Sequence, residues 1–355
     1  KDKAPDMSRR TTTLAFAGGI LVALVALASL LPVPYVIYSP GPMENTLGEQ
    51  DGEPVIQIDG AETYDTEGVL NLTTVGVTPA DGQVDLFSAM RAWLETDRAV
   101  VPRGLVYDDE ETAEEVRERN AQLLERSQET AKVAALRELG YDVPEAVVVD
   151  AVIEGSPADG ELEPGDLVQE VDGQPVAFPQ DVVDLVRARE PGEPVDVVVR
   201  RDGRELDVTL DTEAAEEGHA QVGAGVAVGY DFPVQIDVTI DERIGGPSAG
   251  MVFSIAIYDL LTPGALLDGL YVAGTGEITG DGEVRPIGGI QQKIAAAAGD
   301  GADLFLAPAD NCPDVVDARN GDMAVVSVEG LDDAITAIEA VASGDATSLP
   351  SCEVG

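Results

Sequence analysis

Two side chains that could carry out chemistry stand 45 residues apart in this chain, Ser248 and Lys293. Ser248 follows a Gly-Gly-Pro turn and opens an apolar run, and Lys293 lies about one turn into a segment that continues as four alanines. Lysine can take the proton of a serine only when it is neutral, so burial must lower its pKa from about 10.4 by roughly two to three units. The pair predicts a serine nucleophile with a lysine base, which is the chemistry of a peptide hydrolase.

Each half of this pair also has an ordinary explanation. A Gly-Gly-Pro-Ser run before a helix is often only a turn and an N-cap, and an amphipathic lysine usually extends its ammonium group to water. The other nucleophile chemistries have less support, because His219 is the only histidine and follows the acidic segment 212–218. Neither Cys312 nor Cys352 has a histidine near it in sequence. We therefore expect no Ser-His-Asp triad, Cys-His pair, metal site or cofactor.

Strands and helices alternate from residue 219 onward, which predicts an α/β domain that positions this pair. The expected helices are 248–261, 289–298 and 331–342, and the expected strands include 234–240, 271–275, 304–307 and 324–328. Upstream, 53–77 contains short β-like runs, and 112–139 is a long charged helix opened by a capping-box pattern. The β-like segment 53–77 is a candidate to complete the α/β domain.

A separate block spans residues 146–211. It carries the elements Gly155-Ser156-Pro157-Ala158, Pro164-Gly165-Asp166 and Val171 to Val176 in the order and spacing that resemble a bacterial PDZ domain. The resemblance implies capture of an extended C-terminal peptide tail as an added strand, for which the strand residues Val147, Val148 and Val149 are the candidates. Asp142, which precedes this strand, would repel a peptide carboxylate.

Three motifs of the last block resemble the proteolytic domain of the Lon family. They are Pro247-Ser248-Ala249-Gly250, Thr275-Gly276-Glu277, and Pro286 to Gly289 leading to Lys293. The resemblance implies that Ser248 is the nucleophile, that Lys293 is the general base and then acid, and that the Thr275 hydroxyl supports the lysine. Backbone N–H groups of Ser248 and Ala249 are the oxyanion candidates. It also implies a homo-oligomer.

One acidic position of the family pattern is changed. Lon proteases commonly carry Asp two residues before the proline of the nucleophile motif, and this chain has Gly245 there. The positioning role of that acid is therefore lost, or it is taken over by Asp241 or Glu242.

The N-terminal region predicts a membrane location. Residues 11–31 are uncharged and about long enough to cross a bilayer, and they follow two lysines and two arginines. A retained anchor would place the N-terminus in the cytoplasm and the remainder outside it; the rival interpretation is a cleaved signal peptide. An exterior location permits a disulfide between Cys312 and Cys352, with two free thiols as the alternative. The net charge of −46 argues against nucleic acid as a partner.

The sequence thus predicts an α/β Lon-type proteolytic domain and an α+β PDZ-like domain, preceded by one transmembrane helix. The expected parts are 1–38 (cytoplasmic stub and anchor), 39–140 (β-rich segment and long charged helix), 141–213 (PDZ-like), 219–345 (Lon-type) and 346–355 (tail). We expect an ATP-independent, membrane-anchored serine endopeptidase that cleaves flexible or unfolded protein segments outside the cytoplasm, gated by its PDZ domain. The alternative is a non-catalytic PDZ scaffold on an inactive Lon-type fold.

Overall fold

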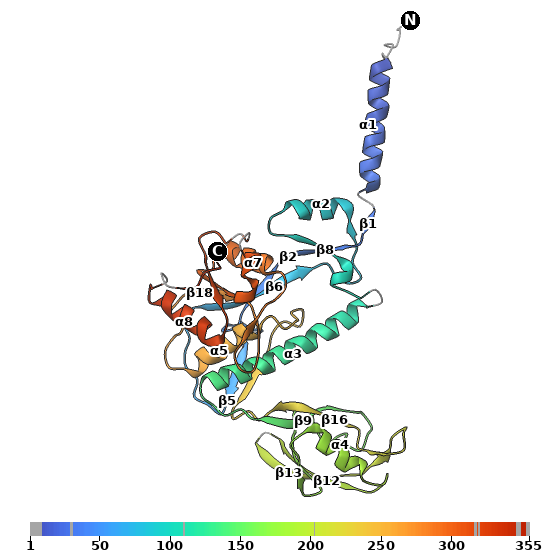
Figure 1. The fold of residues 1–355 in the computed structure, drawn as a ribbon, viewed down its shortest axis with the longest axis vertical. Coiled ribbons are helices and arrows are strands. Elements are labelled where there is room, and N and C mark those ends of the chain that lie inside the picture. Colours follow the sequence, from blue (N-terminus) through green and yellow to red (C-terminus); the bar gives the residue numbers. More distant parts are fainter. Residues whose placement is uncertain are drawn as a thin grey trace. The chain divides into compact units, whose positions relative to one another are not determined.

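The computed structural model divides the chain into two compact units (Figure 1). The first unit joins residues 1–139 to residues 236–355, and the second is the continuous stretch 140–235. The structure describes residues 9–28, 31–108, 111–201, 203–315, 318, 320–345 and 349–352. The N-terminal stub 1–8 and most of the tail 346–355 lie outside these residues.

A six-stranded mixed sheet forms the centre of the first unit, in the order β22-β21-β18-β6-β2-β8. The strands are β22 (Ala324–Val328), β21 (Leu304–Pro308), β18 (Tyr271–Gly274), β6 (Val69–Val77), β2 (Tyr35–Asn45) and β8 (Ala99–Pro102). The first four are parallel to one another, and β2 pairs antiparallel with β6 on one side and with β8 on the other. Strand β6 therefore lies between β18 and β2. Residues 35–102 supply three strands of this sheet, and residues 271–328 supply the other three.

The inner strands β18 and β21 are largely apolar because both faces of this part of the sheet are covered. Every residue of β21 is buried, and so are three of the four residues of β18. Three helices contact strands of this sheet: α5 (Gly250–Leu261), α6 (Ile290–Asp300) and α8 (Leu331–Ala342). A fourth, α3 (Ala113–Glu138), packs against α5 and α8 (Figure 1). The sequence thus provides a rigid apolar core from which the loops at the strand ends project.

Helix α3 is the long charged helix expected at 112–139. It opens with a capping box in which the Glu115 N–H donates to Thr112 Oγ1 at 3.2 Å, and the Thr112 N–H donates to the Glu115 carboxylate at 2.8 Å. Its apolar stripe packs against α5, and Ser254 Oγ of α5 donates to the Ala131 carbonyl at 3.2 Å. The helix is thus part of the first unit's core.

Shorter elements complete the first unit. These are α1 (Arg9–Ala28), β1 (Pro32–Val33), β3 (Glu49–Gln50), β4 (Glu53–Pro54), β5 (Ile56–Asp59), β7 (Val84–Asp85), α2 (Leu86–Leu94), η1 (Arg103–Leu105), β17 (Gln235–Val238), β19 (Glu277–Ile278), β20 (Val284–Arg285), η2 (Ala309–Asn311) and α7 (Cys312–Val315). Strand β17 pairs with β5, which fixes the point where the chain re-enters this unit.

The transmembrane helix expected over residues 11–31 is not supported. Helix α1 occupies most of this stretch and includes two arginines in its first turn. Within the described ranges, no helix combines the length and the apolar character that crossing a bilayer requires.

The second unit is a sheet in the order β13-β12-β10-β9-β16 with one helix, α4 (Pro179–Arg187). Its strands are β9 (Glu145–Val152), β10 (Leu167–Val171), β11 (Gln174–Pro175), β12 (Val195–Arg201), β13 (Arg204–Leu210), β14 (Glu213–Ala214), β15 (Ala220–Gln221) and β16 (Ala224–Tyr230). A valine-rich core fills it. Asp166 is 1% exposed and is held by Arg201, whose Nε donates to its carboxylate at 2.7 Å.

Candidate active site

The turn before Ser248 is held in place by α3. The Gly246 N–H donates to the Asn120 carbonyl at 2.8 Å, and Ser127 Oγ donates to the Pro247 carbonyl at 2.9 Å. A Cβ at Gly245 would lie 2.8 Å from the Asn120 Cβ, so this close approach requires glycine. Gly246 has φ 95°, which also favours glycine. Sequence reasoning missed Asn120 and Ser127, since nothing in a surface-like helix pattern shows which loop the helix supports.

Ser248 is half-buried at the entrance to α5. Its carbonyl accepts hydrogen bonds from the Gly276 N–H at 2.9 Å and from Thr275 Oγ1 at 3.0 Å. The helix begins two residues later than expected, with Ala249 as its N-cap. The N–H groups of Ser248 and Ala249 donate no hydrogen bond among the described residues, and they lie at the positive end of the helix dipole. They are therefore available to a developing oxyanion.

Lys293 lies on α6 and is 2% exposed. Its Nζ donates to Ser248 Oγ at 2.8 Å and to Thr275 Oγ1 at 2.7 Å. The start of α6 is fixed by Gly289, which has φ 72° and where a Cβ would lie 2.6 Å from a methyl group of Val75. The structure therefore brings together the three side chains that the sequence singled out, with Thr275 bridging the lysine and the serine backbone.

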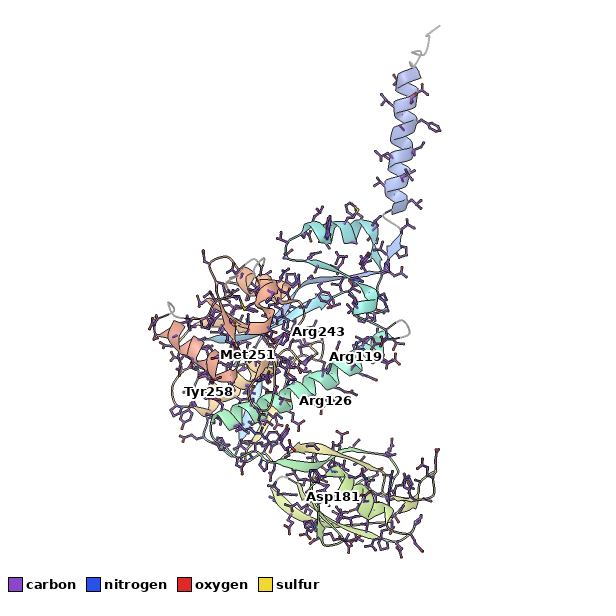
Figure 2. The ribbon with its side chains drawn as sticks, in the orientation of Figure 1. Arg119, Arg126, Asp181, Arg243, Met251 and Tyr258 are labelled. Carbon is purple, nitrogen blue, oxygen red and sulfur yellow. A yellow bond between two sulfur atoms is a disulfide. The ribbon has the colours of Figure 1, made fainter. Side chains whose placement is uncertain are left out.

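Burial lowers the pKa of Lys293 to about 7, because an ammonium group loses its hydration in this apolar surrounding. No carboxylate forms an ion pair with Lys293 in the described part of the chain. Of the two acids considered in place of the family aspartate, Asp241 is held by Arg243 (labelled in Figure 2), with Nη2 to Oδ2 at 2.6 Å, and Glu242 is exposed. Hydrogen bonds from Arg243 lower the pKa of Asp241 to about 2.

A cleft of about 760 Å³ opens onto Ser248 and Lys293. One wall is the segment of β6 from Thr73 to Val77, beyond the last residue of β6 that pairs with β18. Other parts of the lining come from Asp241, from 243–249 and from 286–288. Since β18 ends at Gly274, the β6 edge that faces the cleft is open to an added strand.

The 286–288 wall is fastened to the C-terminal part of the unit. The Ile287 N–H donates to Asn311 Oδ1 at 2.9 Å, and Asn311 Nδ2 donates back to the Ile287 carbonyl at 3.0 Å. Cys312, the next residue, forms a disulfide with Cys352. The Ser327 N–H also donates to the Pro350 carbonyl at 2.8 Å, so the tail is secured at two points. Asn311 is a positioning residue that the sequence motifs did not reveal.

The peptide-binding residues expected in the second unit are wrong. Val147 and Val148 of β9 pair with β10 on one side, and Val147, Val148 and Val149 pair with β16 on the other. A strand paired on both edges cannot accept a peptide by strand addition. The edge strands of this sheet are β13 and β16. Strand β16 pairs with β9 and contacts α4, and it follows residues 146–211, in which the sequence placed the PDZ-like block.

The remaining candidates lie apart from this site. His219 belongs to the second unit, where its Nδ1 lies 3.8 Å from the Glu217 carboxylate. Among the described residues, no group of three His, Cys, Asp or Glu side chains could hold a metal ion.

Comparisons with known proteins match both units. The profile of the Lon protease (S16) C-terminal proteolytic domain matches residues 242–340, and that of the PDZ domain matches residues 118–212. The PDZ match begins inside α3 and ends before β16, whereas the compact unit runs from 140 to 235. The second unit runs from 140 to 235, because α3 packs in the first unit and β16 completes the second unit's sheet.

Individual relatives agree with these profiles. The Lon protease of Paraburkholderia phytofirmans is 45% identical over 26% of this chain and 12% of its own length. Lon protease 1 of Herpetosiphon aurantiacus is 33% identical over 38% of this chain and 16% of its own. A probable periplasmic serine endoprotease DegP-like of Ectopseudomonas mendocina is 32% identical over 37% of this chain and 29% of its own. The chain therefore spans less than a third of each of these relatives.

The matched profile encloses Ser248, Thr275 and Lys293, which the structure brings within hydrogen-bond distance of one another. The chain thus contains a Lon-type C-terminal proteolytic domain and a PDZ domain, and the compact unit of the PDZ domain interrupts in sequence the unit that holds the proteolytic domain.

Proposed function

We propose that this protein is a serine endopeptidase that uses Ser248 and Lys293 as a catalytic dyad. The observation that carries the proposal is the environment of the lysine: it is 2% exposed, lacks an ion-pair partner among the described residues, has its pKa lowered to about 7, and lies 2.8 Å from Ser248 Oγ. A lysine retained only for packing or solubility would keep its ammonium group in water. Here it is neutral for a large part of the time at pH 7, and the neutral amine is a base.

Acylation follows from this geometry. Neutral Lys293 takes the proton of Ser248 Oγ as the oxygen attacks the peptide carbonyl carbon, and the carbonyl oxygen becomes an oxyanion. The N–H groups of Ser248 and Ala249 donate to that oxyanion, supported by the α5 dipole. Thr275 Oγ1, which donates its proton to the Ser248 carbonyl, accepts a hydrogen bond from the lysine and orients Nζ toward the serine.

The same lysine completes the cycle. Protonated Lys293 gives its proton to the departing amine, so the peptide bond breaks and an ester of Ser248 remains. Neutral Lys293 then takes a proton from a water molecule that attacks the ester, and returns it to Ser248 Oγ as the acid product leaves. Protons and charges balance over the cycle, and no cofactor enters it.

Substrate binds in extended form along the open part of the β6 edge. Strand addition needs a segment whose backbone hydrogen bonds are not already used, so flexible or unfolded segments fit and folded ones do not. No GxxxxGK[ST] phosphate-binding loop occurs in the 355 residues. We therefore propose that cleavage of such segments does not require ATP.

The PDZ unit gates this site through its two connections. It follows α3, which holds the nucleophile turn through Asn120 and Ser127, and it precedes β17, from which the chain continues to Ser248. A peptide tail added to the edge strand β16 would pull on both segments. We propose that such a ligand changes the rate of cleavage rather than only recruiting substrate.

The disulfide between Cys312 and Cys352 indicates the compartment in which the proteolytic domain works. Disulfides form and persist in oxidising compartments outside the cytoplasm, and Cys312–Cys352 secures the segment that carries Asn311. We propose that the proteolytic domain works outside the cytoplasm.

The test is incubation of the full chain with β-casein, an unfolded protein, without ATP, and with product analysis by mass spectrometry. Wild type is expected to produce peptides, and Ser248→Ala and Lys293→Met none. Ser156→Ala, a substitution in the PDZ unit, is the matched control and is expected to retain activity. Cleavage that survives in Ser248→Ala would refute the dyad. A chain that stays inactive in every form, even with candidate PDZ ligand peptides, would favour the scaffold alternative.

A further inference from the structure

The cleft beside Ser248 contains more negative than positive charge. The ionisable side chains that line it, besides Lys293 and Tyr107, are Glu44, Asp241, Arg243 and Glu277. Asp241 and Arg243 neutralise each other through a two-point ion pair. With Lys293 neutral, the remaining charges are the two carboxylates of Glu44 and Glu277.

Both carboxylates are half-buried. Neither forms an ion pair among the described residues, although Arg243 attracts Glu44 at longer range. Arg285 stands opposite Glu277 in the β19–β20 ladder, but it pairs with Glu283 at 3.6 Å and does not line the cleft. A half-buried carboxylate that forms no ion pair is a ready partner for a cation on a bound molecule.

These carboxylates flank the place where a substrate would lie. Glu277 follows Gly276, whose N–H donates to the Ser248 carbonyl at 2.9 Å. Glu44 stands opposite Leu72 in the β2–β6 ladder, immediately before the open part of the β6 edge. One carboxylate therefore lies beside the nucleophile and the other beside the substrate-binding strand.

Five further lining residues are apolar (Leu72, Val75, Val77, Ile244 and Ile287), and they stand beside the polar side chains of Thr73, Thr74 and Asn120. A site with apolar walls and carboxylates matches a side chain with an aliphatic stem and a cationic end, which is the structure of lysine and arginine. An acidic substrate side chain would be repelled, and a short polar one would leave the walls uncovered. The charge of the whole chain, −46, attracts the same class of substrate at long range.

We propose that Glu44 and Glu277 make this cleft selective for protein segments that place lysine or arginine close to the cleaved bond. This inference rests on the proposed function, and it adds the substrate class that the site prefers.

The experiment uses a positional peptide library in which each position is occupied in turn by Lys, Gln or Glu, with cleavage followed by mass spectrometry. Wild type, Glu44→Gln, Glu277→Gln, the double variant and Glu283→Gln are compared as full chains. The readout is the ratio of kcat/KM for the Lys peptide to that for its Gln counterpart. We expect this ratio to be at least about 10 in wild type at its most selective position, from an ion pair worth about 1.4 kcal/mol.

The ratio is expected to fall toward 1 in the double variant and with rising salt, and to stay at the wild-type value in Glu283→Gln, whose carboxylate lies outside the cleft. A wild-type ratio near 1, or a ratio that the double variant retains, would overturn the inference. An equal fall in Glu283→Gln would assign the preference to the overall charge of the chain and would also overturn it.

Failure of the proposed function gives a different result, because wild type would then cleave no peptide or Ser248→Ala would cleave as wild type does. In that case anisotropy of fluorescein-labelled Lys and Gln peptides with the Ser248→Ala chain tests the charge preference alone. Equal affinities there would overturn it, and a preference for the Lys peptide that is lost in Ser248→Ala/Glu44→Gln/Glu277→Gln would support it.

Discussion

Replacing Lys293 by methionine is expected to stabilise the proteolytic unit at neutral pH, although it removes the proposed catalytic base. Methionine fills a similar volume without a charge. The measurement compares Ser248→Ala with Ser248→Ala/Lys293→Met, so that neither chain can digest itself. The reason for the gain is that the folded chain holds Lys293 at a pKa of about 7, against 10.5 for the ordinary group.

This difference of pKa fixes the magnitude. One pKa unit is worth about 1.36 kcal/mol, so burial of Lys293 costs about 4 kcal/mol at pH 7, where half of the lysine is protonated. Methionine also leaves the Thr275 hydroxyl without the lysine as a donor, which offsets about 1 kcal/mol of the gain. The net expected stabilisation at pH 7 is about 3 kcal/mol.

The pH dependence identifies the cause. Because the folded pKa is depressed, the unfolded chain binds one proton more than the folded chain between pH 7 and pH 10.5. The stability of the lysine form therefore rises with pH across this window relative to the methionine form. The advantage of methionine is expected to shrink by about 3 kcal/mol between pH 7 and pH 10.

Urea unfolding followed by circular dichroism at 222 nm is the suitable assay. The 26 residues of α3, together with α5, α6 and α8, dominate that signal, whereas the PDZ unit contributes the 9-residue helix α4. A stability difference that stays constant from pH 7 to pH 10 would refute the depressed pKa, and with it the argument for a neutral lysine base. A loss of stability in the methionine form at pH 7 would refute it as well.

Three further predictions follow from the same contacts. The kcat of β-casein cleavage is expected to fall tenfold per pH unit below an apparent pKa near 7, because only neutral Lys293 is a base; a flat profile from pH 5 to pH 8 would contradict this. Thr275→Val is expected to lower kcat by about 10²-fold with little change in KM, while Thr275→Ser restores most of the activity. Breaking the disulfide by Cys312→Ser/Cys352→Ser is expected to cost about 4 kcal/mol by the chain-entropy relation for a 40-residue loop, measured by urea unfolding; an unchanged midpoint would contradict it.

The sequence was most informative where local motifs carry the chemistry. The turn that presents Ser248 and the helix that carries Lys293 each have a local signature, and their mutual approach followed from the resemblance of three motifs in order. Helix α3 was also predictable as a helix, since its capping box and its length are local properties.

Long-range pairing was not predictable. The role of Asn120 depends on the approach of Gly246, which is more than a hundred residues away in sequence. Strand β16 follows the PDZ motifs in the chain but lies at the sheet edge beside β9, so the expectation that Val147 receives a peptide failed. The expected transmembrane helix rested on the length of the uncharged run 11–31 and on the basic residues before it, and the structure does not support it.

The insertion of the PDZ unit has a consequence for biosynthesis. Strand β6 needs β18 as its neighbour, and about two hundred residues of chain, including the whole PDZ unit, are made between them. On the ribosome the PDZ unit is complete by residue 235 and can fold at once, whereas the first 139 residues must wait for their partner strands. Ser248 and Lys293 also emerge only after the whole PDZ unit, so the proposed dyad cannot form before that unit has been made. The order of the segments would therefore keep the proposed activity from appearing before the PDZ unit that is proposed to control it.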